Sequence, residues 1–197
     1  MKLFVFFDGI RQEFFVGYGI MVSTGNKHSA IYDAALEGTN MKNKKLCAIF
    51  GENPSELEFG YDEEYYTCAV MKFRLVSAMQ DALADGCREF ISTLDEGAAM
   101  WGAEACLAIK SLGGDVTLTV APTSERQAER WHPERRERYF NLIEKADELI
   151  SPVGDEYGED YILKSVGRVI VVGNTSHPRI AEFIENARAE QIEICVV

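Results

Sequence analysis

From Lys45 onward, short apolar stretches alternate along the chain with longer amphipathic ones. The short stretches are rich in β-branched residues, which is typical of strands covered on both faces of a sheet. They predict strands over residues 46–50, 88–92, 116–121, 148–151, 168–172 and 192–197. The stretches between them predict helices over residues 62–84, 97–111, 133–146, 159–166 and 178–190. This alternation is typical of βαβ units and predicts an α/β fold with a parallel sheet.

Two of the predicted helices carry informative patterns. In the helix over 62–84, apolar residues recur at helical spacing, namely Tyr66, Val70, Phe73, Val76 and Leu83. The helix over 178–190 has Pro178 near its first turn. Ser176 lies just before that turn, so it is the expected N-cap.

The first 44 residues follow a different pattern, with strand-like runs separated by turn residues and no long helix between them. They predict an antiparallel β extension over 1–44, ahead of an α/β domain over 45–197. The run FFDG followed by VGYGIMV is also faintly similar to the opening strands of the RNase H fold. The rest of that fold does not fit before Lys45, so a sheet extension or a dimerisation ribbon is favoured.

The composition is that of a globular protein, with 47% hydrophobic and 26% charged residues. No apolar run approaches the length of about 18 residues that a membrane helix needs, so we expect no membrane partner. Asp8 interrupts the apolar start of the chain, and no small-residue cleavage site follows it. A strand is therefore favoured over a signal peptide, and a cytoplasmic location is expected.

Five cysteines and three histidines are scattered along the chain without metal-ligand spacing. No two cysteines form a C-x-x-C pair, and no histidine has a second ligand type nearby at zinc spacing. We therefore expect buried, reduced cysteines, no metal and no cofactor.

The net charge of -12 disfavours polyanionic partners, so nucleic acid is an unlikely partner. The densest basic cluster comprises Arg126, Arg130, Arg135, Arg136 and Arg138. Glutamates are interleaved with these arginines, which favours a solvated helix face with local ion pairs.

The loops that follow the predicted strands are the expected place for a ligand. In a parallel sheet, the carboxyl ends of the strands and the helix N-termini after them form the usual ligand crevice. These loops span residues 51–57, 93–97, 122–127, 151–157 and 173–178. Small and turn-forming residues gather in them, including Gly51, Gly97, Pro122, Thr123, Gly173, Asn174 and Thr175. Such residues allow close approach of a phosphate, although they are also ordinary loop residues.

No strong catalytic motif is present: the sequence has no G-x-G-x-x-G, P-loop, G-x-S-x-G or H-E-x-x-H. The two tryptophans leave alternatives open. Trp101 shares an apolar helix face with Ala105 and Ala108, which favours core packing. Trp131 follows the third-strand loop, where core packing and stacking on a base are equally compatible with the pattern.

Three successive post-strand segments together resemble the YpsA-like branch of the SLOG (Smf/DprA and LOG) superfamily. The segment GENPSELEFG carries Gly51, Pro54, Glu56 and Leu57. The segment STLDEGAAMWGAEA carries Gly97, Trp101, Ala103 and Glu104. The segment APTSERQAERW and the helix after it carry Pro122, Gln127, Trp131 and Tyr139. The resemblance covers residues 45 to 197.

This resemblance implies a Rossmann-like parallel sheet with helices on both faces and a nucleotide-like ligand. The chain departs from the family pattern at Thr93 and Leu94, where a glycine is usual, and at Ala99, where an acidic residue is frequent. The phosphoribohydrolase signature P-G-G-x-G-T-x-x-E is absent.

The leading prediction is a protein that binds or senses a nucleotide-like small molecule. The expected ligand-binding residues are Gly51, Pro54, Thr93, Glu96, Gly97, Trp101, Pro122, Thr123, Arg126, Gln127, Trp131, Gly173, Asn174 and Thr175. One alternative is a hydrolase of N-glycosidic or phosphoester bonds, in which Glu96 or Glu104 activates water near Arg126. Another alternative is a scaffold without a ligand that oligomerises through residues 1–44. Under all of these hypotheses, a homodimer or a higher homo-oligomer is expected.

Overall fold

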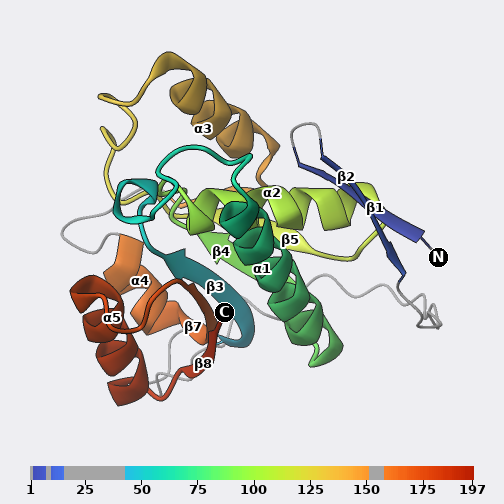
Figure 1. Cartoon of the computed structure of the whole chain (residues 1–197). Helices are drawn as coiled ribbons and strands as arrows, with labels where there is room; N and C mark the ends of the chain where they lie inside the picture. The colour runs from blue at the N-terminus through green and yellow to red at the C-terminus, as the bar shows by residue number, and fades with distance from the viewer. Residues whose placement is uncertain (1, 8–9, 16–42, 151–157) are drawn as a thin grey trace. The chain divides into compact units, whose positions relative to one another are not determined.

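The computed structural model describes residues 2–7, 10–15, 43–150 and 158–197 (Figure 1). The chain divides into two compact units, Met1–Met41 and Lys42–Val197. In the first unit, β1 (Lys2–Phe7) and β2 (Ile10–Phe15) pair antiparallel, from Lys2 opposite Phe15 to Phe7 opposite Ile10. The predicted extension reaches to residue 44, and its segment 16–42 lies outside the described residues.

The second unit is built on a six-stranded sheet in which all neighbouring strands are parallel. Its strands are β3 (Asn43–Gly51), β4 (Glu89–Ser92), β5 (Thr117–Val120), β6 (Glu148–Leu149), β7 (Val166–Val172) and β8 (Glu193–Val196). Their order is β6-β5-β4-β3-β7-β8. All six strands match predicted ones, so the parallel α/β architecture is confirmed.

Helices cover both faces of this sheet (Figure 1). They are α1 (Tyr66–Ala84), α2 (Ala98–Ser111), α3 (Pro133–Lys145), α4 (Gly158–Ser165) and α5 (Pro178–Ala189). Side chains alternate between the two faces of a strand. Accordingly, Cys47 and Ile49 of β3 belong to the core shared with α1, α2 and α3, whereas Ala48 and Phe50 belong to the core shared with α4 and α5. The helices on both faces that the sequence implied are confirmed.

The strand order places the reversal of the sheet between β3 and β7. From β3 the chain passes to α1 on one face, and from β7 it passes to α5 on the other face. In doubly wound sheets, such a switch point opens a crevice at the carboxyl ends of the two strands.

The helical spacing noted over 62–84 matches α1 but does not identify the side of the helix that is most deeply buried. That side carries Cys68, Leu75 and Met79, whereas Tyr66 is 81% exposed and Phe73 is also exposed. The helix carries two apolar stripes, and the sequence pattern does not reveal which one packs on the sheet.

The prediction for the start of α5 is wrong. His177, and not Ser176, is the N-cap, because a residue before a proline is held extended and Pro178 begins the helix. Instead, the backbone N–H of Ser176 donates to Asn174 Oδ1 at 2.9 Å. Among the described residues, no helix combines the length and the apolar character that spanning a bilayer requires.

Candidate functional site at the carboxyl edge of the sheet

Loops that follow four of the strands meet at the carboxyl edge of the sheet. The backbone N–H of Glu52 donates to Val172 O at 3.2 Å, which joins the loop after β3 to the end of β7. Gln127 Nε2 donates to Thr93 O at 3.0 Å and to Asp95 Oδ1 at 2.9 Å, which joins the loops after β4 and β5. The loop over 151–157, after β6, lies outside the described residues.

A buried glutamate of the chain itself lies at the switch point. Glu52 is only 7% exposed, and its Oε1 accepts the backbone N–H of Asn174 at 3.2 Å. A Cβ added to Gly173 would lie 2.9 Å from the Glu52 carboxyl group, so the glycine is required for this contact. The carboxylate thus takes a backbone donor that an anionic ligand would use.

Arg179, in the first turn of α5, lies beside the switch point and is fully engaged. Its guanidinium donates to Gly51 O at 3.3 Å and to Glu159 Oε1 at 2.6 Å. It also stacks over the Phe50 ring and lies 3.8 Å from Asp95 Oδ2. Burial raises the pKa of the Asp95 carboxyl group above its usual value. This polar cluster could not be predicted from the sequence, because its members come from four segments that are far apart in the chain.

The loop after β4 holds a leucine in an unusual backbone conformation. Leu94 has a φ of 55°, in the left-handed region that glycine favours, and its side chain is fully buried. Its N–H donates to Ser92 Oγ at 3.0 Å, and the Ser92 hydroxyl donates to Ala99 O at 2.8 Å. The chain therefore keeps a glycine-like turn here without the glycine.

The two carboxylates expected to activate water are held in ion pairs. Glu96 is buried, accepts the Tyr61 hydroxyl at 3.2 Å and lies 2.9 Å from Arg135 Nε. Glu104 pairs through both oxygens with Arg138. Ion pairs are thus present for Arg135 and Arg138, as the interleaved charges predicted, but their partners lie outside α3.

The two tryptophans have different environments. Trp101 is buried in the core, where its Nε1 donates to Glu63 Oε1 at 2.9 Å. A ligand reaches it only if this packing opens. Trp131 is partly buried, with its ring edge-on to Tyr139 at 5.3 Å between centroids. The ring therefore packs against a tyrosine, and its stacking on a base stays a prediction.

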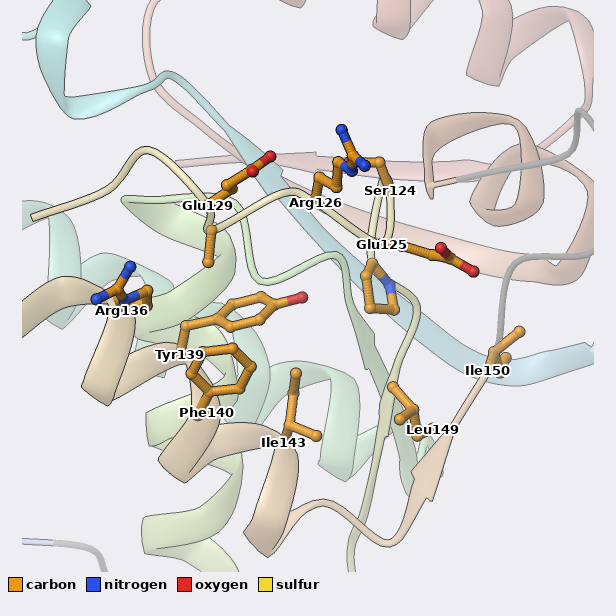
Figure 2. Close-up of a pocket in the computed structure, with 12 residues that line it drawn as sticks. Ser124, Glu125, Arg126, Glu129, Arg136, Tyr139, Phe140, Ile143, Leu149 and Ile150 are labelled. Atoms are coloured by element: carbon orange, nitrogen blue, oxygen red, sulfur yellow. The ribbon is translucent and has the colours of Figure 1, made fainter. Parts of the chain in front are cut away.

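A pocket of about 610 Å³ opens beside the loop after β5, between α3 and β6 (Figure 2). This volume lies within the range of about 300–1,000 Å³ that small-ligand sites span. Its apolar walls comprise Pro122, Ala128, Tyr139, Phe140, Ile143, Leu149 and Ile150. Its polar rim comprises Ser124, Glu125, Arg126, Glu129 and Arg136.

Three polar groups of this pocket have no partner in the described part of the chain. Tyr139 is 5% exposed, yet its hydroxyl makes no hydrogen bond with any described residue. Burial raises the pKa of this hydroxyl, and the nearby charge of Asp95 acts in the same direction. Within the same described residues, Arg126 and Arg136 form no ion pair, although glutamates flank them in sequence.

The predicted site residues are distributed between the pocket and the neighbouring edge. Pro122 and Arg126 line the pocket, and Thr123 fixes the same loop by donating its N–H to Gln127 Oε1 at 2.8 Å. A second group lies near the switch point and comprises Gly51, Pro54, Gly97, Gly173 and Asn174. Thr175 is exposed in the loop after β7.

The pocket residues that the sequence did not nominate as ligand contacts are mainly apolar. Phe140, Ile143 and Leu149 read as ordinary core positions in the sequence. Only their closeness to a post-strand loop would have pointed to the site. Across the described ranges, no group of three or more His, Cys, Asp or Glu side chains is placed to hold a metal ion.

Comparison with known proteins gives a family for this chain. A search among curated proteins found no match. The YpsA family model, described as the YspA SLOG family, matches residues 47–176. The match covers about two thirds of the chain, from within β3 into the loop after β7, and includes the loops after β3, β4 and β5. The chain therefore belongs to the YpsA SLOG family.

Proposed function

We propose that this protein binds a small nucleotide-like molecule at the carboxyl edge of its sheet. The pocket beside the loop after β5 carries the proposal, because it joins apolar walls to arginines that form no ion pair with any described residue. Membership of the SLOG family supports a nucleotide-related ligand. Pro122 and Arg126 are the proposed contacts, and Thr123 and Gln127 hold their loop in place.

The remaining predicted residues have a supporting role in this proposal. Gly51, Gly97 and Gly173 allow the loops to approach one another closely at the switch point. Their contacts are with Glu52, Pro54 and neighbouring strands rather than with the pocket. We propose that they shape the edge and leave ligand contact to the loop after β5.

Binding is favoured over hydrolysis by the environment of the acidic side chains. A general acid or base must come within hydrogen-bond reach of the reacting atom in the right protonation state. Glu96 and Glu104 are both committed to arginine partners, which leaves neither available to activate water. A hydrolase remains the alternative, and product analysis tests it.

The binding proposal is tested by thermal unfolding of the full chain with AMP or ADP-ribose. A ligand at about 100 times its Kd raises the free energy of unfolding by about 2.7 kcal/mol, which shifts Tm by several degrees. We expect such a shift for the wild type, a smaller shift for Arg126→Gln, and an unchanged shift for the exposed loop control Arg130→Gln. If neither compound shifts the Tm of the wild type, the proposal fails.

The hydrolase alternative has its own readout. Incubation with nucleoside monophosphates, followed by chromatography, would reveal a released base and ribose 5-phosphate, or a released phosphate. We expect neither product. Release that disappears in Glu96→Gln or Glu104→Gln would establish the enzyme instead.

We also propose that the chain forms a homodimer or a higher homo-oligomer. Two paired strands such as β1 and β2 rarely form a stable sheet alone in water, and pairing with a second copy would stabilise them. Light scattering of the full chain tests this, and a monomer mass at all concentrations contradicts it.

A further inference from the structure

We infer that the pocket takes a heteroaromatic ring that carries a single anionic group, with the ring against Phe140 and Leu149 and the anion at Arg126. This inference rests on the proposed function, because it specifies how a nucleotide-like molecule occupies that site. It favours a mononucleotide over a nucleoside triphosphate.

Two large apolar side chains stand open at this pocket. Phe140 of α3 is 56% exposed and Leu149 of β6 is 49% exposed, and both line the same cavity. In Figure 2 the rings of Tyr139 and Phe140 lie on one side of the space, and Leu149 and Ile150 lie on the other. A flat ring between them would bury apolar surface on both of its sides and stack on an aromatic neighbour.

The Tyr139 hydroxyl supplies a hydrogen bond at the inner end of the pocket. It points into the cavity in Figure 2, and within the described residues nothing bonds to it. A hydroxyl that faces an open pocket is hydrated when the pocket is empty, and a ligand that displaces this water must supply a hydrogen bond in its place. A ring nitrogen or carbonyl oxygen on a heteroaromatic ligand would satisfy it, whereas a purely apolar ring would not.

The charges at the rim suit one compact anion. Arg126 and Arg136 are free of ion pairs to the described residues, while Glu125 and Glu129 stand beside them. The glutamates and the net charge of -12 oppose a longer polyphosphate. At the switch point, the usual place for a phosphate, Glu52 already holds the Asn174 N–H.

Calorimetric titration of the full chain with AMP, adenosine, ribose 5-phosphate and ATP tests this arrangement. We expect AMP to bind more tightly than the other three. Tyr139→Phe should lower the affinities for AMP and for adenosine by the same factor of about 3 to 10, which corresponds to the loss of one net hydrogen bond. Tyr66→Phe removes a hydroxyl from an exposed site outside the pocket and should change neither.

The anion site is tested separately. Arg126→Gln should lower the affinity for AMP about 10-fold and leave the affinity for adenosine unchanged. It should also reduce the salt dependence of AMP binding. Arg130→Gln is the matched control. Phe140→Ala removes an exposed ring, so this variant is expected to fold. It should lower the affinity for adenosine, and it provides this test even if Tyr139→Phe is unstable.

The outcomes separate the two proposals. If AMP binds but neither Tyr139→Phe nor Phe140→Ala weakens it, this pose is wrong and nucleotide binding stands. Equal affinity for ribose 5-phosphate and AMP contradicts the ring contact, and tighter binding of ATP contradicts the single anion. If the wild type binds neither AMP nor ADP-ribose, the proposed function fails along with the inference.

Discussion

Leu94 shows how a single residue combines backbone strain with core packing. A left-handed conformation costs a residue with a side chain roughly 1–2 kcal/mol, which glycine avoids. Here the same residue buries its whole side chain in the core below α2. Removing a buried leucine side chain costs roughly 2–5 kcal/mol, so packing outweighs strain.

We therefore expect Leu94→Gly to lower the free energy of unfolding by about 2 kcal/mol, as measured by urea denaturation. Gln191 is the matched control, because its φ is 56° but its side chain is exposed. Gln191→Gly should leave stability unchanged or slightly higher. A Leu94→Gly variant as stable as the wild type would show that strain, and not packing, dominates in this turn.

Glu52 gives a second prediction at the residue scale. Glu52→Ala removes the acceptor of the Asn174 N–H, so we expect the free energy of unfolding to fall by about 0.5–1.5 kcal/mol. Inorganic phosphate should restore part of the lost Tm by entering the vacated crevice. Glu52→Gln keeps an acceptor oxygen and should unfold close to the wild type. If phosphate raises the Tm of Glu52→Ala no more than that of the wild type, the substitution does not open a space for an anion.

At the scale of elements, an ion-pair network ties α3 to α2 and to the segment before α1. Arg138 of α3 contacts Glu104 of α2 and Glu63, and Lys72 of α1 also binds Glu63. Burial alone would raise the pKa of Glu63, but hydrogen bonds and charge from Arg138 and Lys72 outweigh it and lower that pKa to about 2. The network therefore stabilises the fold only while Glu63 is ionised.

The pH dependence follows from this depressed pKa. The stabilisation is fully present above about pH 4.5, the usual pKa of a glutamate, and it is lost as the pH falls toward 2. We expect the difference in unfolding free energy between wild type and Glu63→Gln to be largest at pH 7 and to shrink below pH 4.5. Glu64→Gln, at an exposed neighbour, should show no such dependence. A difference that stays constant down to pH 3 would contradict the depressed pKa.

The existence of the elements followed from the sequence, because short β-branched runs and amphipathic stretches have distinct periods. Which side of each helix packs on the sheet did not follow from it. In α1 two apolar stripes compete, and only the packing against β7 and α2 selects the one with Leu75 and Met79. The partners of Arg135 and Arg138 escaped prediction because they lie on other segments, which periodicity within one helix does not report.

At the scale of the whole α/β unit, the sequence indicated which loops share an edge but not their order along it. Many strand orders are compatible with the same alternation of strands and helices. The observed order places β3 beside β7, which brings Glu52 to Gly173, and it places β6 at the end of the sheet, where Leu149 stays exposed. The pocket was only half anticipated for this reason: its loop was predicted, and its apolar wall was not.

The side chain of Gln127 has a consequence for communication across the sheet. Its side-chain carbonyl accepts the N–H of Thr123, and its amide donates to Thr93 and Asp95. These hydrogen bonds hold the loop after β5, which carries Arg126, against the loop after β4. Asp95 in its turn faces Arg179 at the start of α5, on the opposite layer. A continuous series of polar contacts thus connects the loop that lines the pocket to α5 on the other face of the sheet. Binding of a ligand in the pocket could change the position of α5 through these contacts.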